Sequence, residues 1–363
     1  MTTPAEAGFY MPAEWETHEG TWLQWPHDDT FPDHQMRLEH FWLAMAMPLH
    51  QHEVVHIAVQ DERRAEHVLH LLDYYDFDMG NIDTHLIPTD DVWARDNGPI
   101  FVVDGGGNLA VTDWNFNGWG ERYPYKVDRT VPAEIADSLN IARYNAPITL
   151  EGGGVEVNGQ GTLLATRSSI INDNRNPGVS QSEIEAAMKA YLGLEQIIWL
   201  TGAGREYCDY IGDDTDLHVD GDTRFVDDST VLHSWTPDKA NPAFPSLDRH
   251  RQELEAATTE SGKPLTVIPL PIPDKMVYST EDPATRPPFR SKLAVAIYAN
   301  YYVANKVVLV PVYGDVNDAP AKGIIAEHFP DREIVGIPVQ VVAELGGMMH
   351  CLTQQQPAVE QSG

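Results

Sequence analysis

The order of the predicted secondary-structure elements constrains the fold of this chain most, because one short succession of elements recurs. Two strands, a helix and a third strand are predicted near residues 98–145, and the same order returns from residue 155. The second helix has clear ends, since Ser180 is a favourable N-cap and Gly193 follows Leu192. The elements of four such ββαβ units are predicted at 98–104, 109–116, 131–138 and 141–145; at 155–158, 162–166, 180–192 and 196–200; at 222–226, 229–235, 247–261 and 265–270; and at 294–303, 306–312, 319–329 and 333–338.

The two ends of the chain are predicted to form a fifth unit together. A strand around Cys351 would pair with the run Gly20 to Trp25. A helix at 34–50 and a strand from Glu53 to Val59 would complete the unit. This pairing closes a ring of ββαβ units, as in repeat architectures with radial symmetry.

We expect the units to form one α/β domain over residues 1–357, followed by a disordered tail at 358–363. A single domain is expected because each unit buries its strands only against its neighbours. The competing architecture is a doubly wound parallel sheet. The hairpin-like strand pairs do not favour that sheet, and no Gly-x-Gly-x-x-Gly turn lies between a strand and a helix.

The charge of the chain limits the classes of partner that it can bind. Lys and Arg total 24 against 55 Asp and Glu, so the 363 residues carry a formal net charge of −31 at pH 7. Such a chain repels phosphates, and we expect neither nucleic acid nor an anionic membrane as a partner. It attracts a small cationic substrate, and we favour a salt-adapted source over an ordinary acidic cytosolic protein. Whether the protein forms a homodimer is left open.

Cysteine usage and the absence of long apolar runs favour a cytoplasmic location. Two cysteines, Cys208 and Cys351, do not make a disulfide framework in a chain of this length. Met1 to Tyr10 has neither the basic nor the apolar region of a signal peptide. No apolar run approaches the ~18 residues of a membrane span.

Five polar or nucleophilic residues occupy the same place in their units, at the entrance to the first strand. They are Asp96, Glu151, His218, Asp220 and Cys351. Residues at equal phase in a closed ring converge on its axis, so these five could line one pocket. Taken singly, an aspartate beside a glycine is more often a turn residue, and a single cysteine is as often a small core residue. The shared phase favours the functional interpretation.

The chemistry of these residues suits a guanidinium group. Two neighbouring carboxylates are costly to bury unless a cation pairs with them, and a planar guanidinium donates parallel hydrogen bonds to each. Asp96 and Asp220 could therefore clamp a guanidinium and leave its carbon facing the thiolate of Cys351. His218 would protonate the departing amine and later activate water, while Glu151 would orient the imidazole.

Two other interpretations stay open on the residues alone. His218 and Asp220 with a further carboxylate resemble a metal-ligand set, although no second histidine lies at a suitable spacing. Loss of activity to EDTA but not to iodoacetamide would favour that metal mechanism. Alternatively, the acidic pocket could bind cationic ligands without chemistry. His350 is predicted to be structural, because alternation on a strand would point it away from the Cys351 face.

Eight segments, spread nearly end to end, carry a resemblance to a known family. They are Met11–Glu16, Trp93–Pro99, Asp113–Gly120, Glu151–Gly154, Asn174–Pro177, Asp216–Asp220, Tyr298–Asn305 and His350–Pro357. In these segments the chain resembles the agmatine deiminase family, which also contains bacterial peptidyl-arginine deiminases of the same fold. No single segment is rare, but their number and order make the resemblance specific.

The resemblance implies a five-bladed α/β propeller of ββαβ modules with pseudo-fivefold symmetry. It also implies hydrolysis of a guanidine to a urea and ammonia through a covalent thiouronium intermediate, with no metal and no cofactor. The residue roles that it implies are Cys351 as nucleophile, His218 as acid and base, Glu151 as the partner of His218, Asp96 and Asp220 as guanidinium ligands, Trp93 as a side chain packed on the substrate, and Asn300 as a further substrate-binding candidate.

Two departures from the family pattern bear on the substrate. The N-terminal segment Trp25–Pro32 differs from the one usual in agmatine deiminases. Arginine-directed members need a cation for the substrate carboxylate, yet Asn115–Gly120 contains no arginine and the nearest is Arg122. We therefore expect agmatine to be converted to N-carbamoylputrescine, with citrulline formation from arginine or peptidyl arginine as the alternative. The Arg205–Tyr210 stretch looks inserted relative to the family, so Cys208 is interpreted as structural.

Overall fold

The computed structural model describes residues 2–27, 35–204, 207–208, 212–274, 277–278, 293–294 and 296–359. Parts of the Trp25–Pro32 and Arg205–Tyr210 segments therefore lie outside the described residues, as do residues 360–363 of the predicted tail. Ala358 is described, and its N–H donates a hydrogen bond to the carbonyl of Thr17.

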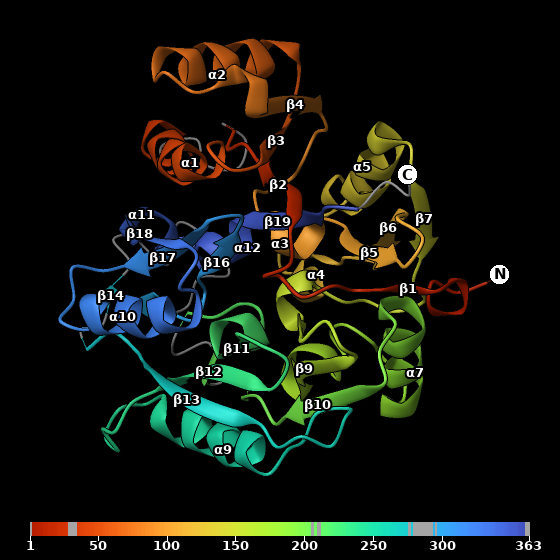
Figure 1. Ribbon diagram of the computed structural model, residues 1–363, viewed down its shortest axis with the longest axis vertical. Helices are drawn as coiled ribbons and strands as arrows, with labels where there is room; N and C mark the ends of the chain where they lie inside the picture. The colour runs from red at the N-terminus through yellow and green to blue at the C-terminus, as the bar shows by residue number, and fades with distance from the viewer. Residues whose placement is uncertain are drawn as a thin grey trace.

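Four sheets have the predicted ββαβ order, and within each the first two strands are antiparallel while the third joins the second in parallel (Figure 1). The first unit has β5 (Ile100–Asp104), β6 (Leu109–Asp113), α5 (Val131–Leu139) and β7 (Ala142–Asn145). The second has β8 (Glu156–Val157), β9 (Thr162–Thr166), α7 (Gln181–Leu192) and β10 (Gln196–Leu200). The third has β11 (Thr223–Phe225), β12 (Thr230–Trp235), α9 (Phe244–Glu255) and β13 (Thr266–Pro271). The fourth has β16 (Tyr302–Ala304), β17 (Val307–Val312), α10 (Asp318–His328) and β18 (Glu333–Pro338).

The fifth sheet joins the two ends of the chain, as predicted. Strand β19 (Thr353–Pro357) pairs antiparallel with β2 (His18–Gln24), and β2 pairs in parallel with β3 (Val54–Val59) after helix α1 (Gln35–Leu49). Helix α2 (Glu62–Tyr74) and strand β4 (Ile82–Leu86) extend this sheet beyond the predicted unit.

Short elements complete the description. Strand β1 (Phe9–Tyr10) pairs with β5 of the first unit, and β14 (Val277–Tyr278) pairs with β15 (Leu293–Ala294). The remaining helical segments are η1 (Ala5–Ala7), η2 (Met79–Asn81), α3 (Ala94–Asn97), α4 (Gly118–Glu121), η3 (Asp128–Thr130), η4 (Gly152–Gly154), α6 (Arg167–Ile170), η5 (Val219–Gly221), α11 (Gln340–Ala343) and α12 (Met349–Leu352).

The sheets lie around the middle of the molecule, with the long helices on the outside (Figure 1). Strand β19 lies against β5, and β8 lies against β11, so first strands of neighbouring units contact one another near the centre. The mixed α/β class is confirmed. A large hydrophobic cluster packs α1 and β3 against β17 and the segment before β19, so the core is continuous between units.

Local sequence explains why helix α7 matches its predicted bounds. The Ser180 side chain accepts a hydrogen bond from the Glu183 N–H, and the Glu183 carboxylate accepts one from the Ser180 N–H. This capping box satisfies N–H groups that the first helical turn leaves without partners. Gly193 ends the helix in the left-handed region at φ 67°, where a residue without a Cβ is favoured.

Two predicted elements were wrong in their bounds. Over the described part of the predicted strand 294–303, β15 ends at Ala294 and β16 begins only at Tyr302, because Tyr298, Ala299 and Tyr301 lie in an irregular buried segment between them. The predicted helix 247–261 is α9, which begins three residues earlier and ends at Glu255. Its start includes Pro245, which fits the first helical turn because the N–H that proline lacks would have no helical partner there.

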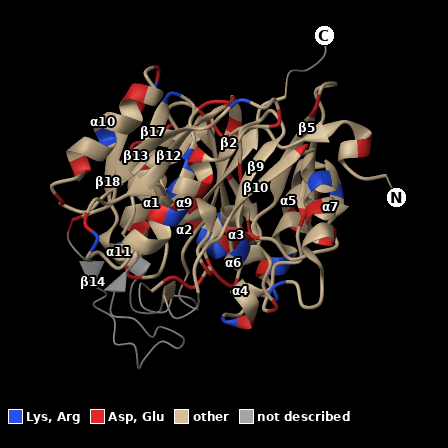
Figure 2. Cartoon of the chain, turned by 90° about the horizontal axis from the view of Figure 1, so that it is seen from below, with Lys and Arg blue, Asp and Glu red and all other residues tan. Residues whose placement is uncertain are grey.

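Charged side chains are spread over the molecule (Figure 2). Acidic side chains occur on helices and loops around the molecule and outnumber the basic ones (Figure 2). Among the described residues, no helix has both the length and the apolar character needed to span a bilayer.

Candidate active site

The candidate residues lie in short segments that immediately precede the first strand of each unit. Asp96 is in α3 before β5, Glu151 directly precedes η4 and β8, and His218 caps η5 before β11. Asp220 is within η5, Cys351 is in α12 before β19, and Asn300 lies just before β16. Turn α12 contacts α3, α3 contacts η4, and η4 contacts η5. The structure therefore brings the candidates together from all five units.

The local structure at Cys351 differs from the prediction. Cys351 lies in the helical turn α12 rather than on a strand, and β19 begins two residues later. The backbone N–H groups of His350 and Cys351 in this turn both donate to Asn300 Oδ1, at 3.1 and 3.4 Å. The prediction about His350 relied on strand alternation, and that reason was wrong.

His218 and Glu151 form a buried pair. The His218 Nε2 atom lies 3.2 Å from Glu151 Oε2, and its Nδ1 atom lies 3.6 Å from Asp96 Oδ1. Burial alone would lower the pKa of His218, but the Asp96 and Glu151 carboxylates raise it to about 9. The imidazole is therefore held cationic at neutral pH, with a proton to donate.

Arg175 fixes Glu151 from the other side. Its Nε donates to Glu151 Oε1 at 2.6 Å, and its Nη1 donates to Asp216 Oδ2 at 2.8 Å. Although burial opposes it, the Arg175 charge lowers the pKa of Glu151, and His218 adds to this effect. Glu151 is thus a carboxylate fixed between two cations. Arg175 lies in a segment that carried the family resemblance, but its contact with Glu151 joins residues 24 positions apart and was not predicted.

His350 holds Asp220 in place. His350 Nδ1 lies 2.7 Å from Asp220 Oδ2, and its Nε2 lies 2.7 Å from Glu14 Oε2. Asn300 Nδ2 donates to the same Asp220 oxygen at 3.1 Å. Burial would raise the pKa of Asp220, but the His350 contact lowers it. His350 therefore supports a candidate site residue instead of facing away from the site.

Asp96 depends on a glycine for its position. Its Oδ2 accepts from Trp119 Nε1 at 2.8 Å, and its Oδ1 accepts from the Gly153 N–H at 3.0 Å. A Cβ on Gly153 would lie 2.6 Å from His218 Nδ1 and 2.8 Å from Asp96 Oδ1. Only a residue without a side chain lets these groups approach one another so closely. Burial raises the pKa of Asp96, and the charges of Asp220 and Glu151 add to the rise.

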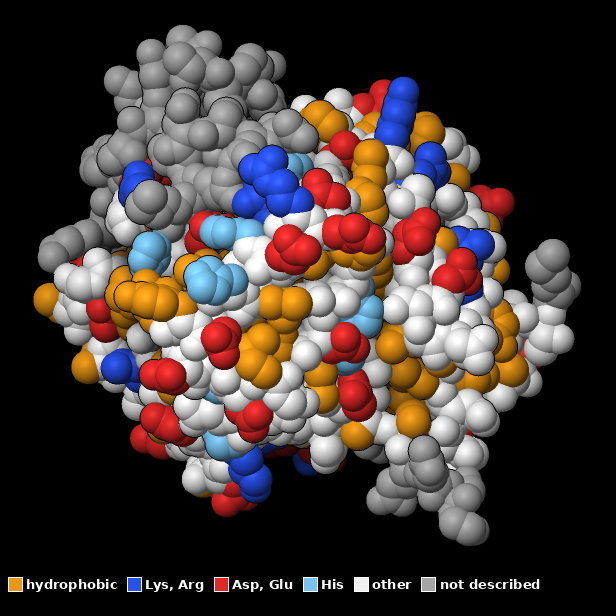
Figure 3. Space-filling model, turned by 90° about the horizontal axis from the view of Figure 1, so that it is seen from above, with side chains coloured by type: hydrophobic (Ala, Val, Ile, Leu, Met, Phe, Trp, Pro, Cys, Tyr) orange, Lys and Arg blue, Asp and Glu red, His pale blue; other side chains and the backbone are white. Residues whose placement is uncertain are grey.

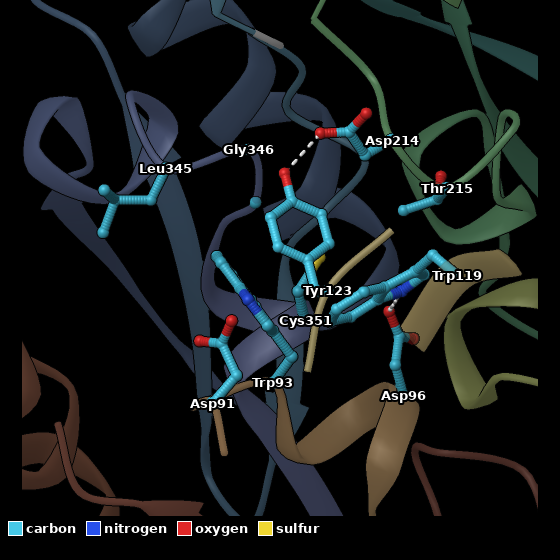
Figure 4. A pocket seen from close by; sticks show the side chains of 11 residues that line it. Asp91, Trp93, Asp96, Trp119, Tyr123, Asp214, Thr215, Leu345, Gly346 and Cys351 are labelled. Carbon is cyan, nitrogen blue, oxygen red and sulfur yellow. Dashed lines mark hydrogen bonds between the residues drawn. The ribbon is translucent and has the colours of Figure 1, made fainter. Parts of the chain in front are cut away.

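The Cys351 thiol faces a pocket between aromatic rings (Figure 4). The pocket is lined by Asp91, Trp93, Asp96, Trp119, Tyr123, Asp214, Thr215, Leu345, Gly346, Gly347 and Cys351. Cys351 Sγ lies 3.5 Å from Asn300 Oδ1. Burial raises the pKa of the thiol, and the Asp220 and Asp96 carboxylates raise it further. A cation bound between those carboxylates would favour the thiolate.

The pocket wall includes residues to which the sequence alone assigned no role. They lie beside Trp93, to which the resemblance did assign substrate packing and which is so close to Gly347 that a Cβ there would lie 2.4 Å from its ring. The Tyr123 hydroxyl donates to Asp214 Oδ2 at 2.7 Å, and the Trp119 ring stands across from Trp93 (Figure 4). Trp119 is at φ 53°, in the left-handed region. This left-handed turn places Trp119 in the pocket wall, and the sequence does not predict such a turn at a tryptophan.

The chain is similar to known proteins over nearly its whole length. A family model described as Porphyromonas-type peptidyl-arginine deiminase matches residues 10–357, and the agmatine deiminase of Pseudomonas aeruginosa is 34% identical across 98% of both chains. The chain belongs to the agmatine deiminase family.

Solved structures of agmatine deiminases share the same fold. The Enterococcus faecalis agmatine deiminase is 29% identical, with a TM-score of 0.89 over 99% of this chain and 98% of that one. A cysteine-to-serine variant of the C. jejuni agmatine deiminase with substrate bound is 26% identical, with a TM-score of 0.82 over 97% of both chains. A catalytic cysteine is thus implied for members of the agmatine deiminase family.

The metal alternative for His218 and Asp220 gains no support from side-chain geometry. Within the part of the chain that the structure describes, the one group of three side chains positioned to share a metal ion is His56, Asp83 and His85. That group lies on β3 and β4 and includes neither His218 nor Asp220.

Proposed function

We propose that this protein hydrolyses the guanidino group of agmatine to N-carbamoylputrescine, with release of ammonia. The observation that carries the proposal is the buried cluster of Cys351, Asp96, Asp220, His218 and Glu151 in a chain of the agmatine deiminase family. Of these five residues, Cys351 and Asp96 line the pocket. Relatives named agmatine deiminase, one of them solved with substrate bound, support the substrate.

Asp96 and Asp220 bind the guanidinium in this proposal. Both are buried, and both act on the Cys351 thiol from nearby. A guanidinium placed between them pairs with both carboxylates, which are costly to bury without a cation. The same cation favours loss of the Cys351 proton, so binding activates the nucleophile. Trp93 packs on the substrate, and Asn300 holds both Asp220 and the Cys351 backbone.

The first chemical step forms a bond between Cys351 Sγ and the guanidinium carbon. His218 then donates its proton to one nitrogen, and the C–N bond breaks to release ammonia and leave a cationic thiouronium on the cysteine. Neutral His218 next takes a proton from water as the water oxygen bonds to the same carbon. The C–S bond breaks, the thiolate is restored, and the ureido product loses its extra proton to solvent. Glu151 keeps the imidazole oriented throughout.

The pocket favours agmatine over arginine on charge. Of the pocket-lining residues that the structure describes, none is a lysine or an arginine, whereas Asp91 and Asp214 contribute carboxylates. Arg122, the nearest arginine predicted from the sequence, directs its Nη2 at Asp216 at 2.8 Å. An ammonium at the far end of the substrate is therefore compatible with this pocket, and a carboxylate there is not.

A product assay with agmatine, free arginine and a peptidyl arginine tests the proposal. We expect ammonia and N-carbamoylputrescine from agmatine, with the other two compounds much slower. Cys351→Ser should abolish turnover, while the matched Cys208→Ser control, which removes the other thiol, should retain it. If citrulline formed faster than N-carbamoylputrescine, the proposed substrate would be wrong but the proposed mechanism would still stand. Full turnover by Cys351→Ser would reject the mechanism.

The same reasoning extends to architecture and setting. We propose that the five ββαβ units form a five-bladed α/β propeller with pseudo-fivefold symmetry and that residues 1–357 make one catalytic domain. The order of the units around the centre supports this arrangement (Figure 1). Three expectations stay predictions: a cytoplasmic location, no cofactor and no nucleic-acid partner. Whether the protein forms a homodimer stays open.

A further inference from the structure

We propose that His56, Asp83 and His85 form a binding site for a divalent transition-metal ion of the zinc type. The site lies on the sheet face formed by β3 and β4, outside the catalytic pocket. Figure 3 shows this end of the molecule, where histidine side chains lie among acidic ones. Two imidazoles and one carboxylate are a ligand set that suits zinc and its neighbours.

The three ligand atoms form a nearly equilateral triangle. His56 Nδ1 lies 3.1 Å from His85 Nε2 and 3.7 Å from Asp83 Oδ2, and His85 Nε2 lies 3.3 Å from Asp83 Oδ2. A tetrahedral zinc ion with bonds of about 2.0–2.1 Å places its ligand atoms roughly 3.3–3.4 Å apart. The three distances therefore bracket the edge length of one face of such a tetrahedron.

Sheet register explains why these side chains meet. Strands β3 and β4 are parallel, with His56 opposite Asp83 and Ala58 opposite His85. Asp83 and His85 are two positions apart on β4, so both point to the same face of the sheet. His56 points to that face from the neighbouring strand. The ligands thus come from rigid strands that need no rearrangement.

Each imidazole has an inner nitrogen, which faces the triangle, and an outer nitrogen, which points away from it. Both outer nitrogens have partners. His56 Nε2 lies 3.0 Å from Glu19 Oε2, and His85 Nδ1 lies 2.9 Å from the Ser138 hydroxyl. A carboxylate behind a histidine fixes its proton on the outer nitrogen and leaves the inner lone pair for a metal. The Trp22 ring stacks on His56 at 4.6 Å and contacts His85 at 4.4 Å between centroids. Both ligand rings are therefore held in orientation.

A hydrogen bond between the two imidazoles is the simpler explanation of their contact. It accounts for the 3.1 Å distance but not for the convergence of Asp83 on both inner nitrogens. The Asp83 side chain is 57% exposed, whereas those of His56 and His85 are 5% and 10% exposed. An ion could therefore enter from solvent on the Asp83 side and keep a water as its fourth ligand.

Zinc titration of the full chain tests the site. The Cys351→Ser protein is used after treatment with EDTA and desalting, because the Cys351 thiolate is itself a zinc ligand. Calorimetry should give one zinc equivalent, and zinc should raise the melting temperature, since the ion joins β3 to β4. His85→Gln should abolish the binding or weaken it at least tenfold. Glu19→Gln should weaken it by roughly tenfold, as expected when the partner of a histidine ligand is removed.

Matched controls separate this site from zinc bound elsewhere. His67→Gln removes a half-exposed histidine that also contacts a glutamate, Glu39, and should leave the affinity unchanged. If His85→Gln does not fold by circular dichroism, Asp83→Asn repeats the test at an exposed side chain. Cobalt should give visible absorption bands in the parent protein that zinc displaces and Asp83→Asn lacks. Equal zinc binding by the ligand variants, or no saturable binding by the parent, would overturn the proposal.

Discussion

At the scale of single residues, the site is a chain of charges in which each group sets the state of the next. Arg175 holds Glu151 as a carboxylate, Glu151 and Asp96 hold His218 as a cation, and His350 holds Asp220. These contacts are buried, where a charge without its partner is expensive. Replacement of Glu151 or His350 should therefore change the pKa of the residue that each one contacts, His218 or Asp220.

Replacement of Glu151 by Gln should shift the pH profile. The proton on His218 is needed for ammonia release, so kcat/KM of the parent enzyme should fall as pH rises through about 9. Glu151→Gln removes a carboxylate that raises the pKa of His218, so this alkaline limb should move to lower pH and activity at neutral pH should drop. The raised pKa of His218 also affects the stability of the fold. The charged imidazole contributes its full stabilisation below the unfolded pKa of about 6.5, and this contribution is lost as pH rises through the folded pKa of about 9. If the alkaline limb of the pH profile did not move, Glu151 would not control the pKa of His218.

Replacement of His350 by Gln should weaken substrate binding more than chemistry. The Asp220 carboxylate loses its contact with His350 Nδ1 at 2.7 Å, so the pKa of Asp220 should rise. Its ion pair with the guanidinium should then weaken. A hydrogen bond to a charged group contributes about 1.5–3 kcal/mol, so kcat/KM should fall roughly tenfold or more, mainly through KM. The exposed His70→Gln serves as control. A pure loss of kcat with unchanged KM would contradict this role.

At the scale of elements, the short turns before the first strands carry the chemistry, and glycines allow those turns to converge. Turn η4 contacts both α3 and η5, and Gly153 lies between Asp96 and His218. The element order and the bounds of α7 were predicted because periodicity and caps are local signals. The pairing of β19 with β2 was predicted because the elements left at the two chain ends complete a fifth unit. The helical turn at Cys351 was not, because its conformation depends on contacts with residues such as Asn300 that are distant in sequence.

Gly153→Ala should strongly reduce activity while the fold survives. The new Cβ would lie 2.6 Å from His218 Nδ1, so the imidazole must move away from Asp96 and Glu151. We expect turnover to fall by about a hundredfold, since a displacement of about 1 Å in a catalytic group costs that much. Gly105→Ala is the matched control, because a Cβ there meets no atom within 4 Å. Circular dichroism should be unchanged in both variants, and an active Gly153→Ala would show that this close approach is unnecessary.

At the scale of the whole molecule, the excess of acidic residues opposes folding through mutual repulsion. Salt at 1 M shortens the screening length to about 3 Å, against about 10 Å at 0.1 M. The melting temperature should therefore rise between 0.05 and 1 M NaCl, measured by circular dichroism. The kcat/KM for agmatine should fall over the same range, because screening weakens attraction of a cationic substrate. A melting temperature that falls with salt would mean that specific ion pairs outweigh the net repulsion.

The sequence by itself determined the succession of ββαβ units, the union of the chain ends in one sheet, and the residue types that suit guanidine chemistry. These depend on local periodicity, capping and the family motifs. Only the tertiary structure decided that Arg175 supports Glu151, that His350 bridges Glu14 and Asp220, and that Trp119 and Tyr123 line the pocket. It also brought His56 to Asp83 and His85 on a strand that the sequence did not predict. Such contacts follow from strand register and turn geometry across distant segments, which no local pattern encodes.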